Sequence, residues 1–167
     1  MKWLTGSNMQ SKMAERHEDS IFEALKKNDK KYMENRYQTS KLLEVFTVRS
    51  LAKQMGTGPH ANEPVILNAV NPGLCHSSLS REVKGIRRLI FETMKFLLAR
   101  TTEVGSRTLV TAAGAGAESY GRYMSNCYVA PPSPFVRSEE GKKTQDRVYK
   151  ELMEILEKIQ PGVTKNI

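Results

Sequence analysis

The sequence predicts an α/β protein in which helices cover a mostly parallel sheet. Short apolar runs with β-branched residues alternate along the chain with longer amphipathic segments, which is the pattern of strand–helix–strand units. The chain has 167 residues, of which 39% are hydrophobic and 26% are charged, and this is enough for one domain, residues 1–167, with a real core. We expect about three strands, a small number for such a sheet.

The strands are expected at residues 2–5, 64–70 and 121–129. The run over 64–70 is mostly apolar and lies between breakers, so it has the character of a buried parallel strand. Helices are expected around residues 21–25, from residue 32 or 33 to Met55, from Ser80 to Leu97, from Thr102 to Ala115, and from Glu139 to Gln160. The inward face of the helix from Thr102 is predicted to consist of Val104, Leu109, Val110 and Ala113.

The helix that ends at Met55 is the longest without Pro or Gly. Gly56 and Pro59 stop it by supplying a C-terminal cap and a breaker. Its apolar residues occupy more than a single stripe of the helix surface. We therefore expect it to be buried on two sides, against the sheet and against another element.

The composition indicates a cytoplasmic protein. The formal net charge is +8, but the basic residues are interleaved with acidic ones, as on solvated faces, so we expect no nucleic-acid partner. No apolar run approaches the roughly 20 residues that span a membrane, and the first residues do not resemble a secretory signal. Cys75 and Cys127 have no partner motifs, which favours free thiols. Cys75 and His76 also lack further ligands at metal-binding spacing, so no metal site is predicted.

Tyr37 and Lys41 are the residues that point most directly to chemistry. Four residues apart on a helix, they lie on one face, one turn from each other. A nearby ammonium and the first turn of a helix both favour the ionised form of a phenol and lower its pKa. Such a pair can exchange a proton with an alcohol or a carbonyl oxygen. A Tyr–Lys contact on a solvated helix is the alternative interpretation of the spacing alone.

The order of motifs around this pair carries a resemblance. A strand that ends in Gly6-Ser7 precedes it, and a strand that ends in Asn71-Pro72-Gly73 follows it. This order, with the sequence Tyr-Gln-Thr-Ser-Lys in the helix, resembles the second half of the short-chain dehydrogenase/reductase family. The stretch 133–141 also resembles the ending of members from secondary-metabolite pathways. The resemblance covers essentially the whole chain and is most specific between residues 36 and 80.

The resemblance implies roles for individual residues. Tyr37 is the expected general acid/base, and Lys41 is expected to favour its phenolate form and to hydrogen-bond the cofactor ribose. Ser7 is expected to orient the substrate oxygen, although Ser11 or Thr5 could be the matching hydroxyl, and Ser7 could also be a simple turn residue. The loop after the second strand is expected to contact the nicotinamide through Pro72, Gly73 and Ser77.

The family also implies a fold that this chain contains only in part. It corresponds to the C-terminal half of a Rossmann-like, doubly wound parallel sheet, and the N-terminal half with its Gly-rich cofactor turn is absent. The cofactor is therefore NADP or NAD by family only, and we do not expect this chain to hold it alone. The implied reaction interconverts a carbonyl and a secondary alcohol on a hydrophobic small molecule. The loop that contacts this substrate is expected at about residues 74–98.

The long helix also allows a second function. The family commonly uses the long helix, here Met33–Met55, for contacts between subunits. The chain could therefore be a non-catalytic remnant that binds a partner and forms a homo- or hetero-oligomer through this helix. In both cases we expect little or no oxidoreductase activity from this chain alone.

Overall fold

The computed structural model describes residues 13–29, 33, 35–59, 61, 65–76 and 85–167. The α-helices are α1 (Ile21–Lys26), α3 (Arg36–Met55), α4 (Ile86–Leu98), α5 (Thr102–Ala113), α6 (Pro134–Arg137) and α7 (Glu139–Ile159). The strands are β1 (Ala69–Asn71), β2 (Tyr123–Ser125) and β3 (Tyr128–Ala130). Short 3-10 turns are formed by Ala14–His17, Ala117–Ser119 and Val163–Asn166.

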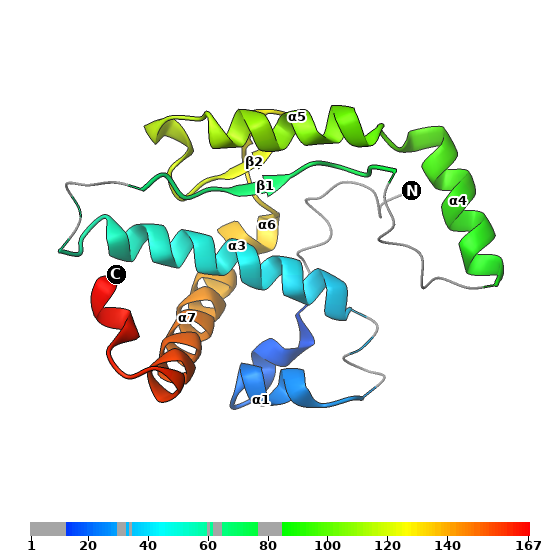
Figure 1. The fold of residues 1–167 in the computed structure, drawn as a ribbon. Helices are drawn as coiled ribbons and strands as arrows, with labels where there is room; N and C mark the ends of the chain where they lie inside the picture. Colours follow the sequence, from blue (N-terminus) through cyan, green and yellow to red (C-terminus); the bar gives the residue numbers. More distant parts are fainter. Residues whose placement is uncertain (1–12, 30–32, 34, 60, 62–64, 77–84) are drawn as a thin grey trace.

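The elements are stacked in layers, with the sheet between helices. Figure 1 shows α5 on one face of the sheet and α3 on the other, with α7 and α1 beyond α3. The strand order is β1-β2-β3; β1 pairs with β2 in parallel, and β2 pairs with β3 antiparallel. The predicted α/β class is confirmed, as is a sheet of three strands, although the sheet is mixed and not purely parallel.

The last predicted strand, residues 121–129, is in fact a hairpin. β2 and β3 are joined by Asn126 and Cys127, which have φ angles of 55° and 67°. Two successive positive φ values form the tight turn whose twist matches antiparallel strands, and Asn is the residue that tolerates the first of them best. The prediction of one strand was wrong because Cys127 is an unusual residue for the second position. The strand predicted at 64–70 is confirmed only at its end, in Ala69–Asn71. The strand predicted at residues 2–5 lies outside the described residues.

The helix α5 is confirmed, but its predicted inward face is wrong. The buried residues are Gly105, Thr108 and Ala112, whereas Val110 is 73% exposed. Gly105 faces Cys75, and a Cβ on this glycine would collide with the Cys75 sulfur, so the absent side chain allows the close approach. The Thr108 hydroxyl donates to the Gly105 carbonyl at 2.7 Å, which satisfies the buried polar group. The residues of α5 that pack inward are therefore small ones, and its large apolar side chains are not buried.

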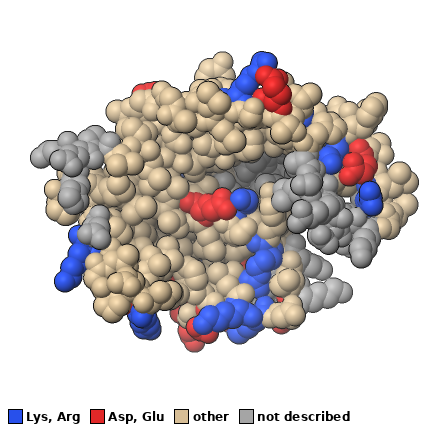
Figure 2. All heavy atoms as spheres, in the orientation of Figure 1, with Lys and Arg blue, Asp and Glu red and all other residues tan. Residues whose placement is uncertain are grey.

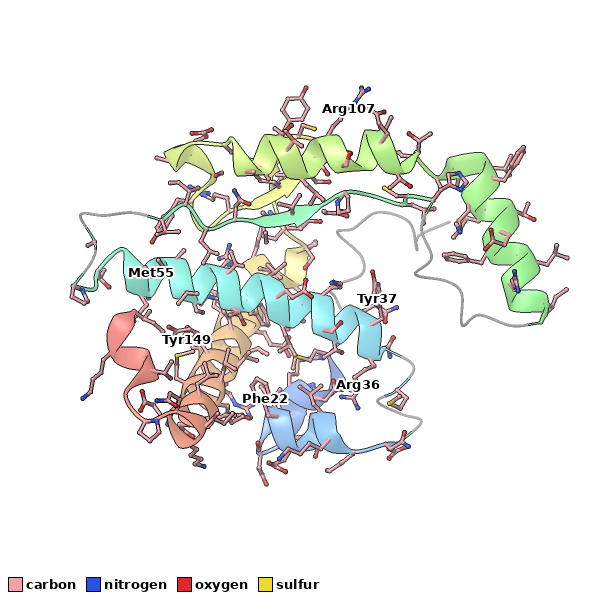
Figure 3. The ribbon with its side chains drawn as sticks, viewed as in Figure 1. Phe22, Arg36, Tyr37, Met55, Arg107 and Tyr149 are labelled. Carbon is pink, nitrogen blue, oxygen red and sulfur yellow. The ribbon has the colours of Figure 1, made fainter. Side chains whose placement is uncertain are left out.

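The long helix α3 is buried on two sides, as predicted. It contacts β1 in the sheet layer and α7 on the opposite side, and Phe46 at its centre is fully buried. Phe22, labelled in Figure 3 beside α1, packs against the same core. The core cluster consists of Met13, Ile21, Leu42, Val45, Phe46, Tyr123, Val136 and Val148. One cluster thus joins the N-terminal segment, the long helix, the sheet and the last helix.

Charged side chains on the surface mostly pair with near neighbours. Figure 2 shows basic and acidic groups interspersed over one face of the molecule. Typical pairs are one turn apart on a helix, such as Lys26 with Glu23 at 2.5 Å and Lys142 with Glu139 at 2.6 Å. Of the helices that the structure describes, none combines the length and the apolar character needed to cross a membrane.

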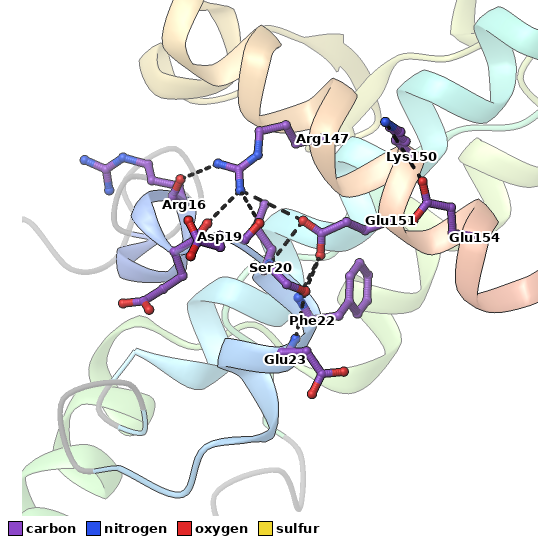
Figure 4. A network of polar contacts seen from close by, with 11 residues as sticks. Arg16, Asp19, Ser20, Phe22, Glu23, Arg147, Lys150, Glu151 and Glu154 are labelled. Atoms are coloured by element: carbon purple, nitrogen blue, oxygen red, sulfur yellow. Dashed lines mark hydrogen bonds and ion pairs between the residues drawn. The ribbon is translucent and has the colours of Figure 1, made fainter.

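The carboxylate of Glu151, on α7, holds the start of α1. It accepts hydrogen bonds from the backbone N–H groups of Ile21 and Phe22, each at 3.1 Å, and from the Ser20 hydroxyl at 3.0 Å (Figure 4). The first N–H groups of a helix have no partner within it, and an anion at this end also interacts favourably with the helix dipole. A residue 130 positions further along the chain thus caps the N-terminus of α1.

One turn before Glu151, Arg147 holds the backbone that leads into α1. Its guanidinium donates to the carbonyl groups of Arg16 and Glu18, each at 2.7 Å, and of Asp19 at 3.2 Å (Figure 4). Arg147 thus donates to three backbone carbonyl groups before α1, and Glu151 accepts from three donors at its start. Because this segment is distant in sequence, no local pattern could have predicted the contact.

Replacing Glu151 by alanine is expected to destabilise the fold. The change leaves the Ile21 and Phe22 N–H groups without an acceptor, so the free energy of unfolding should fall by about 2–3 kcal/mol. Urea denaturation would measure it. Glu154→Ala is the matched control, because Glu154 only faces Lys150 at 4.0 Å on the exposed side of α7, and it should change stability by less than about 0.5 kcal/mol. Equal effects of the two changes would contradict the capping role.

The carboxylate of Glu157 ties the C-terminal turn to α7, and its contribution should depend on pH. It accepts from the N–H groups of Gly162 at 2.7 Å and Thr164 at 2.9 Å and from the Thr164 hydroxyl, and these bonds lower the Glu157 pKa from 4.5 to about 2. A lowered folded-state pKa adds stability above pH 4.5, and that stability is lost as the pH falls towards 2. We expect Glu157→Gln to speed hydrogen exchange at residues 162–165 at pH 7 relative to the wild-type chain. If the difference stayed constant down to pH 2, this assignment would be wrong.

Candidate active site

The N-terminal end of α3 and the carboxyl end of β1 lie at the same edge of the sheet. Figure 1 shows the two elements running in opposite directions, so that the beginning of α3 and the end of β1 are on the same side. In open α/β sheets, ligands bind at the carboxyl ends of the parallel strands. The beginning of the helix that carries Tyr37 and the end of the strand before Pro72 and Gly73 therefore lie on the side of the sheet where such a site is expected.

Tyr37 and Lys41 lie one turn apart on α3, as the sequence predicts. The Lys41 ammonium is 6.0 Å from the centroid of the Tyr37 ring. Tyr37 is 44% exposed, and in Figure 3 it rises from the beginning of α3 on the side of the sheet layer. The Lys41 Nζ also forms an ion pair with Glu44 Oε1 at 2.7 Å. Both groups are open to solvent, and a phenol and an ammonium in this arrangement can serve one reacting oxygen.

A buried carboxylate fixes the position of the residue next to Tyr37. Glu15 is 1% exposed, and its Oε1 accepts from the Arg36 Nη1 at 3.4 Å. The Arg36 Nη2 donates to the Lys27 carbonyl at 3.0 Å. Arg36 is thus held from two sides at the first position of α3, which limits the movement of Tyr37. The sequence analysis missed Glu15, because a polar turn gives no sign that its carboxylate is buried.

The loop after β1 has a defined turn geometry. The Asn71 Oδ1 accepts from the Gly73 N–H at 3.0 Å, which is an Asx turn. Gly73 has a φ angle of 80°, in the left-handed region that favours glycine. The predicted sharp end of the strand is confirmed, and the presence of glycine at this position has a steric reason.

Tyr123 supports Asn71 from the neighbouring strand. β1 and β2 are in register with Asn71 beside Ser125, and the Tyr123 hydroxyl interacts with the Asn71 side chain. Burial raises the pKa of the Tyr123 phenol, and this hydrogen bond offsets part of that effect. Asn71 therefore connects the sheet to the turn at Gly73. The Asn-x-Gly spacing could have indicated the Asx turn, but nothing local indicated Tyr123.

The segment before α5 holds the loop from its other side. The Arg100 N–H donates to the Leu74 carbonyl at 2.8 Å, and the His76 N–H donates to the Arg100 carbonyl at 3.0 Å. The Thr102 hydroxyl donates to the His76 carbonyl at 2.6 Å. The Arg100 guanidinium lies against Gly73, since a Cβ on Gly73 would be 3.6 Å from its Cζ. Residues 74–76 are thus paired like a strand with Arg100, in the segment between α4 and α5, a contact that the sequence did not predict.

Two predicted site residues cannot be placed. Ser7 and Ser77 lie outside the described residues, as do the alternatives Thr5 and Ser11. Tyr37, Lys41, Pro72 and Gly73 are described: the first two lie in the first two turns of α3, and the other two directly follow β1. In the part of the chain that the structure describes, no three His, Cys, Asp or Glu residues lie together as metal ligands.

The sequence of the chain is similar to those of known proteins. The chain is 54% identical over 143 residues to the short chain dehydrogenase/reductase dmxR8 of a Cryptosporiopsis species, an alignment that covers 83% of this chain. The chain belongs to the short-chain dehydrogenase/reductase family. It is also 40% identical over 147 residues to the short-chain dehydrogenase anuD of Penicillium roqueforti, and 36% identical over 150 residues to the short chain dehydrogenase FGM9 of Gibberella zeae. These alignments cover 86% and 90% of this chain.

The short-chain dehydrogenase/reductase relatives are longer than this chain. It spans 42%, 39% and 43% of the length of the three relatives, or about two fifths. No family model matches the sequence, and no solved structure matches the chain. The family therefore rests on the curated relatives, together with the Tyr37/Lys41 helix and the Pro72-Gly73 turn at one sheet edge.

Replacing Gly73 by alanine is expected to strain the loop of the short-chain dehydrogenase/reductase site. A side chain at a φ angle of 80° should lower the free energy of unfolding by about 1–2 kcal/mol. Gly114→Ala is the matched control, because Gly114 has a φ angle of −91° and its Cβ would meet nothing closer than 3.6 Å. That change should leave stability unchanged or raise it by about 0.5 kcal/mol. Chemical denaturation of both variants checks the difference, and a Gly73→Ala chain as stable as wild type would contradict the turn geometry.

Proposed function

We propose that this chain provides the proton-transfer residues of an oxidoreductase that interconverts a carbonyl and a secondary alcohol. The observation that carries the proposal is the position of Tyr37 and Lys41 at the sheet edge formed by β1 and its loop. In the reducing direction, the Tyr37 hydroxyl gives its proton to the substrate oxygen. In the oxidising direction, the Tyr37 phenolate accepts the proton of the alcohol and becomes the hydroxyl again.

Lys41 is the positioning and charge-balancing partner in this proposal. Its ammonium lies near the Tyr37 ring and stabilises negative charge on the phenol oxygen. The competing contact with Glu44 joins two exposed side chains, and exposed ion pairs contribute only about 0–1 kcal/mol. Lys41 can therefore exchange Glu44 for a ligand hydroxyl at little cost. The family resemblance suggests that this ligand is the cofactor ribose.

The described residues fit one end of a nicotinamide cofactor. Pro72 and Gly73 offer backbone without a bulky side chain at the carboxyl end of β1, close to the helix that carries Tyr37 and Lys41. These four residues are the ones proposed to hold it, together with Ser77. When bound, NADP or NAD supplies or accepts the hydride, and the choice between the two nucleotides stays open.

A hydrophobic small molecule is the substrate class that this surface favours. The predicted substrate loop continues into α4, whose outer face carries large exposed apolar side chains, among them Phe96, which is 82% exposed. Exposed apolar surface of this kind is typical of sites that bind apolar molecules. The resemblance of residues 133–141 to the ends of enzymes from secondary-metabolite pathways supports a substrate from secondary metabolism.

The partner-binding function remains a second prediction with less support. Most of α3 is already covered within the chain by α7 and the sheet, and Tyr37 is its exposed large hydrophobic residue. A homo- or hetero-oligomer through Met33–Met55 would therefore use the beginning of this helix. A Tyr37→Lys change should shift such an oligomer towards the monomer in analytical ultracentrifugation.

The activity is tested by placing this chain's sequence into the frame of a relative. In this chimera, the segment of dmxR8 that aligns with this chain is replaced by the corresponding residues of this chain. The oxidation of NADPH or NADH is then followed with apolar ketones as substrates. Tyr37→Phe in this chimera should lower kcat by about 100-fold or more, because the proton donor is removed. Tyr128→Phe, at an exposed position of β3, is the matched control and should leave kcat unchanged. Retained activity in the Tyr37→Phe chimera would overturn the proposal.

A further inference from the structure

A polar cleft lies between α3 and α7, away from the proposed active site. It has a volume of about 490 Å³, within the usual range of small-ligand sites. Arg49, Ser50 and Lys53 of α3 line one side, and Gln145 and Tyr149 of α7 line the other. Figure 3 labels Tyr149, which lies below the C-terminal half of α3, far from Tyr37 at the other end of that helix.

The floor of this cleft is a fixed hydrogen-bond chain. The Arg49 Nε donates to the Gln145 Oε1 at 3.0 Å, and the Gln145 Nε2 donates to the buried Ser50 hydroxyl at 3.0 Å. Gln145 therefore orients the guanidinium through its Nε. The two Nη groups of Arg49 stay available, since no described carboxylate forms an ion pair with Arg49. A guanidinium held in this way presents a planar fork of donors, which matches an oxyanion.

The charges around the cleft are unbalanced. Four cationic side chains line it, Arg49, Lys53, Lys142 and Lys150, against a single carboxylate, Asp146. Lys142 already pairs with Glu139 at 2.6 Å, and Lys150 faces Glu154 at 4.0 Å. Lys53 forms no ion pair within the described part of the chain. Arg49 and Lys53 together thus carry two positive charges against the one negative charge of Asp146, which leaves the cleft with an excess of positive charge.

A neighbouring arginine adds to this imbalance. Burial lowers the pKa of Arg49, and the like charge of Arg122 lowers it further. The repulsion between the two guanidinium groups adds to the positive charge at Arg49, although Arg122 is exposed and does not line the cleft. A bound anion would remove this repulsion, and a dianion would do so more completely than a monoanion.

We propose that the α3–α7 cleft binds the phosphate group of a small molecule, with Arg49 as the central donor and Lys53 at the rim. Tyr149 forms a wall beside the cations, so an organic group attached to the phosphate can lie against its ring. The inference does not depend on the oxidoreductase function, because the cleft and the Tyr37 site use different residues.

Calorimetric titration of the whole chain at constant ionic strength tests the site. The probes are phenyl phosphate, inorganic phosphate and benzoate. The two phosphates should bind about tenfold more tightly than benzoate, because two negative charges meet the excess of cations. Tighter binding of phenyl phosphate than of inorganic phosphate identifies an organic phosphate as the ligand, and equal binding identifies the free ion. Equal binding of benzoate would overturn the proposal.

Three variants locate the binding. Arg49→Gln should weaken phosphate binding by about tenfold, and Lys53→Gln by about threefold. Arg107→Gln is the matched control, because Arg107 lies on the exposed face of α5 and pairs with Glu103, so it should bind as the wild type does. Thermal melting shows whether each variant is folded. If the Arg49→Gln variant does not fold, phosphate binding by the Lys53→Gln variant tests the site, because Lys53 is exposed. Unchanged affinity in Lys53→Gln, or an equal loss in Arg107→Gln, would show that the phosphate binds elsewhere or only through net charge.

Discussion

The burial of α3 on two sides is the constraint on which the rest of the structure depends. Phe46 at its centre packs in the one core cluster that includes residues of the sheet, the N-terminal segment and α7. A helix between two layers cannot rotate without exposing one apolar face, so its side chains keep fixed directions. Because α3 runs opposite to β1, its beginning must lie at the carboxyl edge of the sheet. This packing places the beginning of α3, which carries Tyr37, on the same side of the sheet as the end of β1.

The contacts that define the ends of α1 and α3 are made by residues distant in sequence. Glu151 and Arg147 hold the entry to α1 from α7, and Glu15 holds Arg36 at the first position of α3. Leaving a buried carboxylate without its cation is costly, so Glu15 and Arg36 specify each other's position even where the pair adds little net stability. The same polar contacts thus fix the ends of the helices, while the apolar core fixes their centres.

The sequence predicted the features that depend on local order and missed those that depend on distant partners. The end of α3 at Met55, the end of β1 at Asn71 and the spacing of Tyr37 and Lys41 are local, and the structure has each of them. The start of α3 is at Arg36 and not at residue 32 or 33 as predicted. The turn at Cys127 was missed because its side chain is not typical of a positive φ angle. The inward face of α5 was mistaken because apolar residues were expected to be buried. The nearby Cys75 side chain instead required a glycine, Gly105, at the contact. A strand and a helix can be predicted from their own residues, but a packed face depends on what packs against it.

Two half-buried arginines of α3, Arg36 and Arg49, have different surroundings. Arg36 has a buried carboxylate and a backbone carbonyl as partners, so its charge is balanced and its role is to hold the helix start. Arg49 has the neutral amide of Gln145 as its hydrogen-bond partner and lies near the like charge of Arg122. The hydrogen bond to Gln145 stabilises the Arg49 guanidinium, but a neutral partner leaves its charge unbalanced, unlike that of Arg36. This contrast between two arginines on one helix, together with the cationic lining of the α3–α7 cleft, supports the proposal of an anion site there.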